Sequence, residues 1–126
     1  MYATDEQKER YLPPLATGEE IWCQLFSEPA AGSDVAGIKT KAELDGDTWT
    51  INGQKVWISR VEHSDLLLLL ARTTPKDQIE HKTQGLSVFL IDLREAIGNG
   101  LTIKPIETMV NHHISPKISM ANFELL

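Results

Sequence analysis

The fold of this 126-residue chain is decided by residues 38–59, which read IKTKAELDGDTWTINGQKVWIS. Apolar and polar side chains alternate from Ile38 to Leu44, which is typical of a strand with one solvated face. Asp45-Gly46 and Asn52-Gly53 are pairs that two-residue hairpin loops favour, because type I′ turns need positive φ at both central positions. The stretch therefore predicts a three-stranded meander with strands at 38–44, 48–51 and 54–59.

Further strands are expected on both sides of this meander. Ile21, Cys23 and Leu25 alternate with polar and aromatic neighbours and should share one face of a strand over residues 21–26. Residues 66–72 form an apolar run typical of a buried central strand, although its pattern also allows a helical segment. More strands are expected at 85–93, 101–107 and 118–125, with an exposed loop at 73–84. Six or seven short strands predict an all-β domain, either a small sandwich or a closed or partly open barrel.

One short helix is expected at the start of the chain, over Asp5–Tyr11. Thr4 and Gln7 have the spacing of a capping box, and the acidic residues that follow Thr4 suit the helix dipole. Pro13-Pro14 should end the helix, because proline cannot donate a backbone hydrogen bond and restricts the residue before it. Such a helix is too short to be stable alone. Residues 1–18 are therefore expected to be the end of a preceding helical region, and residues 19–126 the β-domain.

Composition excludes several classes of protein. Twelve Lys and Arg against eighteen Asp and Glu give a net charge of -6, the opposite of a domain that binds nucleic acid. The longest apolar run, Leu66–Ala71, is too short to span a membrane, and the first residues lack the pattern of a secretory signal. The single cysteine, Cys23, excludes an internal disulfide and reads as a small buried residue. No metal site is expected, since none of the histidines form a pair at ligand spacing and all four read as surface residues: His63, His81, His112 and His113. We expect a soluble intracellular domain, cytoplasmic in a bacterium and mitochondrial or peroxisomal in a eukaryote.

Two segments carry residues that could bind a ligand. In residues 24–34 a strand runs into a loop of small residues, whose backbone N–H groups and two hydroxyls suit a flat heterocycle and a pyrophosphate. In residues 56–59, Trp57 and Ser59 should share one strand face, where they could lie along a ring system and hydrogen-bond its edge. Taken singly, each segment also fits a plainer reading, a strand exit with a proline turn and a core tryptophan near a strand end.

Together the two segments resemble one family. Ser-Glu-Pro-Ala-Ala-Gly-Ser-Asp-Val-Ala-Gly at residues 27–37, followed by Asn-Gly-Gln-Lys-Val-Trp-Ile-Ser at residues 52–59, resembles the middle domain of acyl-CoA dehydrogenases. The resemblance extends from the N-terminal helix to about His113. It implies a flavin-binding β-barrel between two helical domains, with FAD between barrel and helices and the acyl-CoA thioester against the flavin.

The resemblance also implies the reaction of a larger enzyme. An acid in the C-terminal helical domain removes the α-proton of an acyl-CoA, flavin N5 accepts the β-hydrogen as hydride, and trans-2-enoyl-CoA is the product. Electrons leave through an electron-transferring flavoprotein, and the whole enzyme is expected to be a homo-oligomer. No residue of this chain corresponds to the catalytic base, so the isolated chain is expected to be inactive.

The same resemblance places eight residues at the cofactor. They fall at the edge of the flavin pyrimidine ring, near the pyrophosphate, and beside the isoalloxazine, where a hydroxyl near N5 would stabilise charge as hydride arrives. In that order they are Gln24, Phe26 and Ser27; Gly32 and Ser33, of which Ser33 also faces the CoA substrate; and Trp57, Ile58 and Ser59. Residues 60–65 and 114–126 depart from the family pattern and take no role. Two alternatives stay open: the middle domain of an acyl-CoA oxidase or related flavin oxidase, and a non-enzymatic β-sandwich interaction module.

Overall fold

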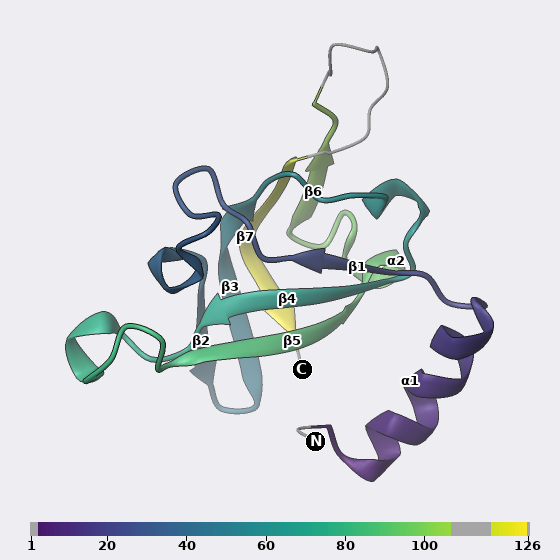
Figure 1. Cartoon of the computed structure of the whole chain (residues 1–126), viewed down its shortest axis with the longest axis horizontal. Helices are drawn as coiled ribbons and strands as arrows, with labels where there is room; N and C mark the ends of the chain where they lie inside the picture. Colours follow the sequence, from purple (N-terminus) through teal and green to yellow (C-terminus); the bar gives the residue numbers. More distant parts are fainter. Residues whose placement is uncertain (1–2, 107–116, 126) are drawn as a thin grey trace.

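The computed structural model describes residues 3–106 and 117–125, and seven strands in these ranges form one sheet that curls into a half-barrel (Figure 1). The all-β expectation is confirmed. The order of the strands in the sheet is β1-β4-β2-β3-β7-β6, with β5 on the other side of β4. The strands are β1 Trp22–Leu25, β2 Lys41–Asp45, β3 Thr48–Lys55, β4 Leu66–Arg72, β5 Leu86–Asp92, β6 Leu101–Lys104 and β7 Lys117–Leu125.

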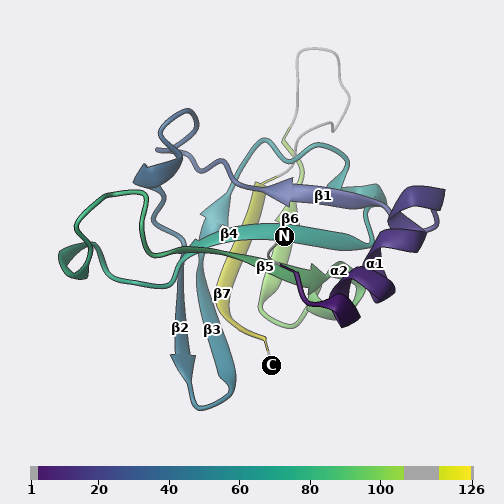
Figure 2. The ribbon, with the colours of Figure 1, turned by 60° about the horizontal axis from the view of Figure 1, so that its bottom comes forward.

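Strand β4 is the centre of the sheet. It pairs along its whole length with antiparallel β5 and along its first half with parallel β1, and it meets β2 at the single pair Lys41↔Arg72 (Figure 2). All but one of the apolar residues in the run 66–71 are buried, and the half-buried exception is Leu68. The central-strand prediction for 66–72 is therefore confirmed, and the helical alternative is wrong.

The first of the two predicted hairpins forms, but its turn lies one residue later than predicted: β2 and β3 pair in antiparallel register up to Asp45↔Thr48, so the two-residue loop is Gly46-Asp47. Gly46 has a φ of 61° and Asp47 does not have a positive φ, so the turn is not the expected type I′, and positive φ at the first loop position alone is the pattern of type II′. β2 begins at Lys41 rather than at Ile38, and Ile38 is instead buried as the residue after a short 3₁₀ helix, η1 (Val35–Gly37).

The second predicted turn is wrong, and with it the three-stranded meander. β3 runs straight through Asn52-Gly53, and its pairing with β7 shifts register between Ile51 and Gly53. A Cβ on Gly53 would lie 2.3 Å from the Thr40 hydroxyl oxygen and 2.7 Å from the Thr40 Cα. Glycine is needed here because another segment packs against its backbone, and not because the chain turns.

The N-terminal helix is longer than predicted. α1 covers Asp5–Thr17, so Pro13 and Pro14 lie inside it, and it ends at Gly18 in the left-handed conformation. The capping box at Thr4 and Gln7 is confirmed, with both reciprocal hydrogen bonds present. Each proline has a helical φ but lacks a backbone donor, and its ring crowds the carbonyl four residues earlier. The helix has no buried residue, so water can solvate the carbonyls left without a partner.

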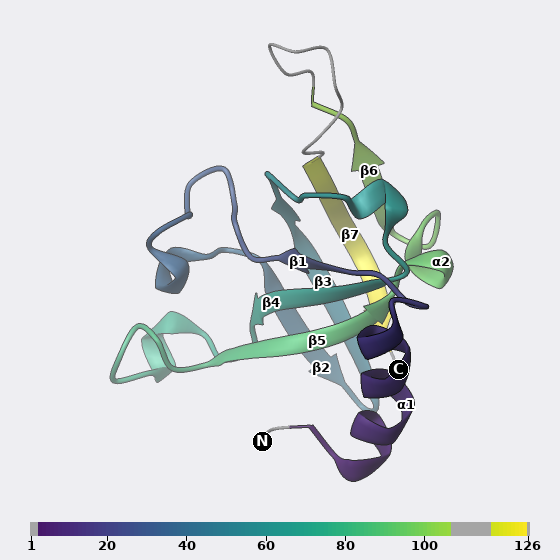
Figure 3. The same cartoon turned by 45° about the vertical axis from the view of Figure 1, so that its right-hand side comes forward.

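The helix lies beside the sheet and not across a face of it (Figure 3). Arg10 donates two hydrogen bonds to Glu20, at 2.8 and 3.0 Å, and the Tyr11 ring meets Trp22 of β1 edge-on at 5.6 Å. A second short helix, α2 (Leu93–Ala96), follows β5 directly and was not predicted; the Asp92 side chain caps it. Strand β6 ends at Lys104, and the strand predicted at 118–125 is confirmed as β7.

Other predictions concern exposure. His63 and His81 are exposed, as predicted, whereas His112 and His113 lie outside the described residues. Cys23 is buried, also as predicted. In the part of the chain that the structure describes, no helix is long and apolar enough to cross a membrane. The same residues hold no cluster of three His, Cys, Asp or Glu side chains that could bind a metal ion.

Candidate ligand-binding hollow

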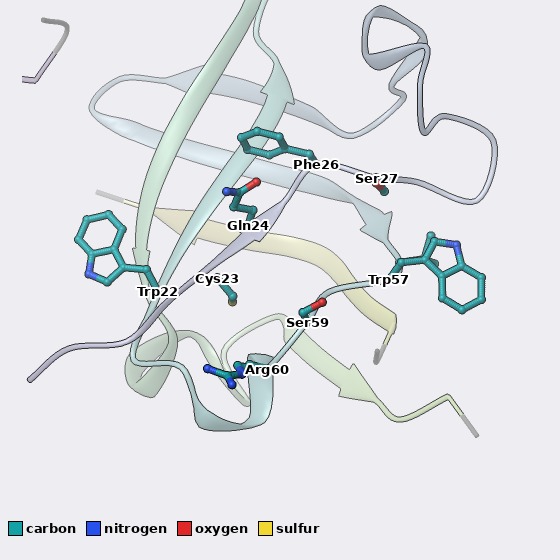
Figure 4. A pocket seen from close by; sticks show the side chains of 9 residues that line it. Trp22, Cys23, Gln24, Phe26, Ser27, Trp57, Ser59 and Arg60 are labelled. Carbon is teal, nitrogen blue, oxygen red and sulfur yellow. The ribbon is translucent and has the colours of Figure 1, made fainter. Parts of the chain in front are cut away.

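Two segments face each other across a hollow of about 370 Å³ (Figure 4). One wall is β1 with its continuation into Phe26 and Ser27, and the other is the loop 56–60 that follows β3. The lining residues are Trp22, Cys23, Gln24, Phe26, Ser27, Val56, Trp57, Ser59 and Arg60. A volume of this size is in the range of small-molecule sites, roughly 300–1,000 Å³.

The β1 wall presents backbone hydrogen-bonding groups. Among the described strands β1 pairs with β4 alone, so its other edge has no strand partner. The Ile21 carbonyl accepts from the N–H groups of Asp65 and Leu66, so Ile21 faces β4. Backbone direction alternates along a strand, and the backbone groups of Gln24 and Phe26 therefore point to the open edge. An unpaired strand edge is a ready site for a ligand with its own donors and acceptors.

The opposite wall has an unusual backbone. Trp57 and Arg60 have φ values of 61° and 63°, and among the described residues they are the two non-glycine residues with positive φ. This conformation costs about 1–2 kcal/mol for each such residue. Adjacent residues of this loop lie in different environments: the Ile58 side chain is buried in the core, whereas the Trp57 side chain is 63% exposed. Strain of this kind gathers at functional sites.

The basis on which Trp57 and Ser59 were paired is therefore wrong, although both line the hollow. Residues 56–59 are not a strand, and no strand alternation places the two side chains on one face. Two left-handed residues turn the chain so that Ser59 points toward β1, while the Trp57 indole projects outward from the loop (Figure 4).

A buried ion pair joins the two walls. Lys55, the last residue of β3, is fully buried, and its Nζ lies 2.9 Å from Glu28 Oε1 and 3.0 Å from the Phe26 carbonyl oxygen. Glu28 also accepts from the backbone N–H groups of Lys39, at 2.7 Å, and Thr40, at 3.0 Å. Burial would raise the pKa of Glu28, but hydrogen bonds from Thr40, Lys39 and Lys55 outweigh it, and the pKa lies below its ordinary value. Burial lowers the pKa of Lys55, and Glu28 opposes that effect.

Cys23 lines the hollow but is not suited to act as a nucleophile. It is 5% exposed, and burial raises the pKa of its thiol, against the opposing hydrogen bond with Ser64. The neutral thiol is the stable form, and the thiolate is the nucleophile.

The hollow brings together five of the eight residues that the sequence singled out. Gly32 and Ser33 do not line it; they follow a tight turn in which Glu28 and Ala31 exchange backbone hydrogen bonds, and both are exposed. Ile58 belongs to the core. The five that line the hollow are Gln24, Phe26, Ser27, Trp57 and Ser59.

Sequence reasoning missed the Glu28–Lys55 pair behind the hollow and four of the residues that line it, Trp22, Cys23, Val56 and Arg60. Lys55 lies between Gln54 and Val56 in the strand predicted at 54–59, and a lysine ordinarily faces water. The one available signal was its place directly before the apolar residues of 56–58, which is weak evidence for a buried charge.

Comparison with known proteins defines the family of this fold and site. Residues 23–123 match the family model "Acyl-CoA dehydrogenase, middle domain". Acyl-CoA dehydrogenase IpdE1 of Mycobacterium tuberculosis is 46% identical over 105 residues, 83% of this chain and 26% of the relative. The structure of a glutaryl-coenzyme A dehydrogenase in complex with glutaryl-CoA superposes with a TM-score of 0.85 at 30% identity, over 98% of this chain and 30% of the other.

A further solved structure, titled as the electron transferring flavoprotein of Acidaminococcus fermentans, has a TM-score of 0.81 at 30% identity, over 97% of this chain and 31% of that one. The chain belongs to the acyl-CoA dehydrogenase family, and it corresponds to the middle domain of these proteins. It spans about a quarter of the length of IpdE1 and about 30% of the matched chains of known structure.

Proposed function

We propose that this domain binds FAD in the hollow between β1 and the loop 56–60, and that it serves as the middle domain of an acyl-CoA dehydrogenase. The observation that carries the proposal is the convergence on one hollow of five residues singled out in the segments 24–34 and 56–59, although the two segments lie about thirty residues apart in the chain. The family membership supports FAD as the ligand, and glutaryl-CoA in a related structure supports an acyl-CoA substrate.

The residues present fit a flavin. The open edge of β1 offers N–H and C=O groups at Gln24 and an N–H at Phe26, which suit the alternating acceptors and donor of a pyrimidine edge. Ser27 and Ser59 each add a hydroxyl, and an exposed indole at Trp57 suits a flat ring. Bound FAD would supply the acceptor for hydride. The Ser59 hydroxyl would hold a hydrogen-bond donor near the atom that gains electron density.

For the whole protein we propose the oxidation of an acyl-CoA to trans-2-enoyl-CoA. Helical domains on both sides of residues 19–126 would supply the catalytic base, the second wall of the cofactor site and the surfaces of a homo-oligomer. Gly32 and Ser33, exposed on the loop after β1, would approach the pyrophosphate, and Ser33 the CoA moiety. An electron-transferring flavoprotein is the proposed acceptor of the electrons, and a related chain in a structure of that title is consistent with it.

Titration with FAD, followed by the backbone and indole N–H signals in NMR spectra of the isotope-labelled domain, tests the proposal. Stacking on Trp57 should contribute about 0.5–1.5 kcal/mol beyond buried area, and each serine hydrogen bond roughly 1 kcal/mol. Association costs about 4–15 kcal/mol in lost translational and rotational freedom, and only one wall of the site contributes favourable contacts to offset it. We therefore expect a dissociation constant in the micromolar range or weaker.

Signals of Gln24, Phe26, Ser59 and the Trp57 indole should shift on titration, and Trp57→Phe should weaken binding. Trp49→Phe is the matched control, because Trp49 packs on Phe89 in the core, with ring centroids 5.2 Å apart, and does not line the hollow. Shifts that avoid both walls of the hollow, or no shifts at millimolar FAD, would contradict the proposal.

A further inference from the structure

The Glu28–Lys55 pair connects three segments of the chain that lie far apart in the sequence. Lys55 ends β3, Glu28 lies in the loop after β1, and the Glu28 carboxylate also receives the backbone N–H groups of Lys39 and Thr40, which precede β2. Next to it, the N–H of Val56 donates to the Ser27 carbonyl at 3.0 Å. Both walls of the hollow are thus tied to one buried charge network.

Stability alone does not account for this pair. The side chains of Lys55 and Glu28 are 0% and 5% exposed. Removing two charges from water costs about as much as their attraction returns, and apolar residues of similar volume are often neutral or stabilising in such places. Apolar side chains make no hydrogen bonds, whereas an ammonium and a carboxylate hold backbone acceptors and donors at defined positions through directional hydrogen bonds.

The contact with Phe26 decides what the open edge of β1 offers. Lys55 Nζ donates to the Phe26 carbonyl, so one of that oxygen's two lone pairs is used inside the protein, and the positive ammonium beside it disfavours a second donor. The N–H of Phe26 is then the group left for a ligand. An acceptor atom of a ligand is therefore favoured opposite Phe26. The same lysine immediately precedes Val56 and Trp57, so its position also sets where the left-handed turn begins.

We propose that Glu28 and Lys55 are a positioning pair, which sets the separation of the two walls of the hollow and makes Phe26 a donor-only contact. The proposal rests on the proposed FAD site. Neither side chain lines the hollow, and both act through the backbone of residues that do.

The test compares the full chain with the variant that carries both Glu28→Gln and Lys55→Met. Its matched control carries Glu43→Gln and Lys41→Met, which remove a surface pair with side chains 64% and 54% exposed. Three quantities are measured for each: the urea midpoint of unfolding, the amide chemical shifts without ligand, and the dissociation constant for FAD from the NMR titration.

For the buried-pair variant we expect a folded domain, ligand-free amide shifts that change at Phe26, Ser27, Val56 and Trp57, and an affinity for FAD about tenfold weaker. The surface-pair control should match the wild type in all three. If the double variant does not fold, Glu28→Gln alone keeps the volume and one acceptor for Lys55, and it should show the same pattern in weaker form.

Two results would overturn the positioning role: wild-type affinity for FAD in the folded variant, or ligand-free shifts that leave both walls unchanged. Failure of the proposed function looks different, because the wild type itself would then show no FAD-dependent shifts at the hollow. In that case the proposed donor-only contact at Phe26 is also refuted. The ligand-free amide shifts still decide whether the ion pair sets the separation of the two walls.

Discussion

The substitution Gly53→Ala tests the close packing of Thr40 against the backbone of Gly53, at a position where the sequence predicted a turn. The φ of Gly53 is not in the left-handed region, so alanine is compatible with the backbone and the cost is steric. The new methyl group would lie 2.3 Å from the Thr40 hydroxyl oxygen and 2.7 Å from the Thr40 Cα, where ordinary contact begins at 3.4 Å. A rotation of the threonine side chain can relieve the first overlap but not the second, which needs a shift of the backbone.

Overpacking of a well-packed site costs about 1–3 kcal/mol, and a backbone overlap places Gly53→Ala in the upper half of that range. Gly32→Ala is the matched control, because its Cβ would meet nothing within 4 Å and its φ is not positive. That substitution should change stability by less than about 1 kcal/mol, in the stabilising direction, through the entropy of the unfolded chain.

Urea unfolding followed by circular dichroism measures both variants. We expect a lower midpoint for Gly53→Ala with an unchanged denaturant slope, since the same surface is exposed on unfolding. Adding Thr40→Ala should recover part of the loss, because it removes the hydroxyl but leaves the Cα. A Gly53→Ala midpoint equal to that of Gly32→Ala would refute the reasoning.

Two further predictions concern the strained turn and the buried carboxylate. Trp57→Asn should raise the free energy of unfolding by about 1 kcal/mol, because asparagine tolerates positive φ and the indole is mostly exposed, and it should weaken FAD binding; thermal unfolding and FAD titration measure the two effects, and a loss of stability would count against strain at Trp57. Because the pKa of Glu28 lies below its ordinary value of 4.5, its contribution to stability is present above that pH and is lost as the pH falls through the folded-state pKa. Urea midpoints between pH 6 and pH 3 should therefore fall more steeply for the wild type than for the variant with Glu28→Gln and Lys55→Met, and parallel profiles would contradict this.

Local patterns in the sequence were sufficient where the physical cause is local. The turn between β2 and β3 needs positive φ at Gly46, which glycine adopts readily, so the hairpin could be predicted, although its loop is Gly46-Asp47 and not Asp45-Gly46. The run at 66–71 is apolar because a central strand is covered on both faces, and the final strand was predicted at 118–125, within one residue of its observed bounds. The five hollow-lining residues were found through the family motifs, and their contact with FAD stays a prediction.

The sequence by itself therefore determined the strand content, the first hairpin, the helix cap and the two segments that meet at the hollow. Tertiary structure decided the rest, because the causes lie far apart in the chain. Position 53 requires glycine because Thr40 packs against its backbone. The Glu28 carboxylate, which lies in the loop after β1, compensates the buried ammonium of Lys55 at the end of β3. Trp57 leaves the strand pattern because its neighbours Val56 and Ile58 are held in the core while the chain turns, and no short-range pattern encodes that balance of burial against backbone strain.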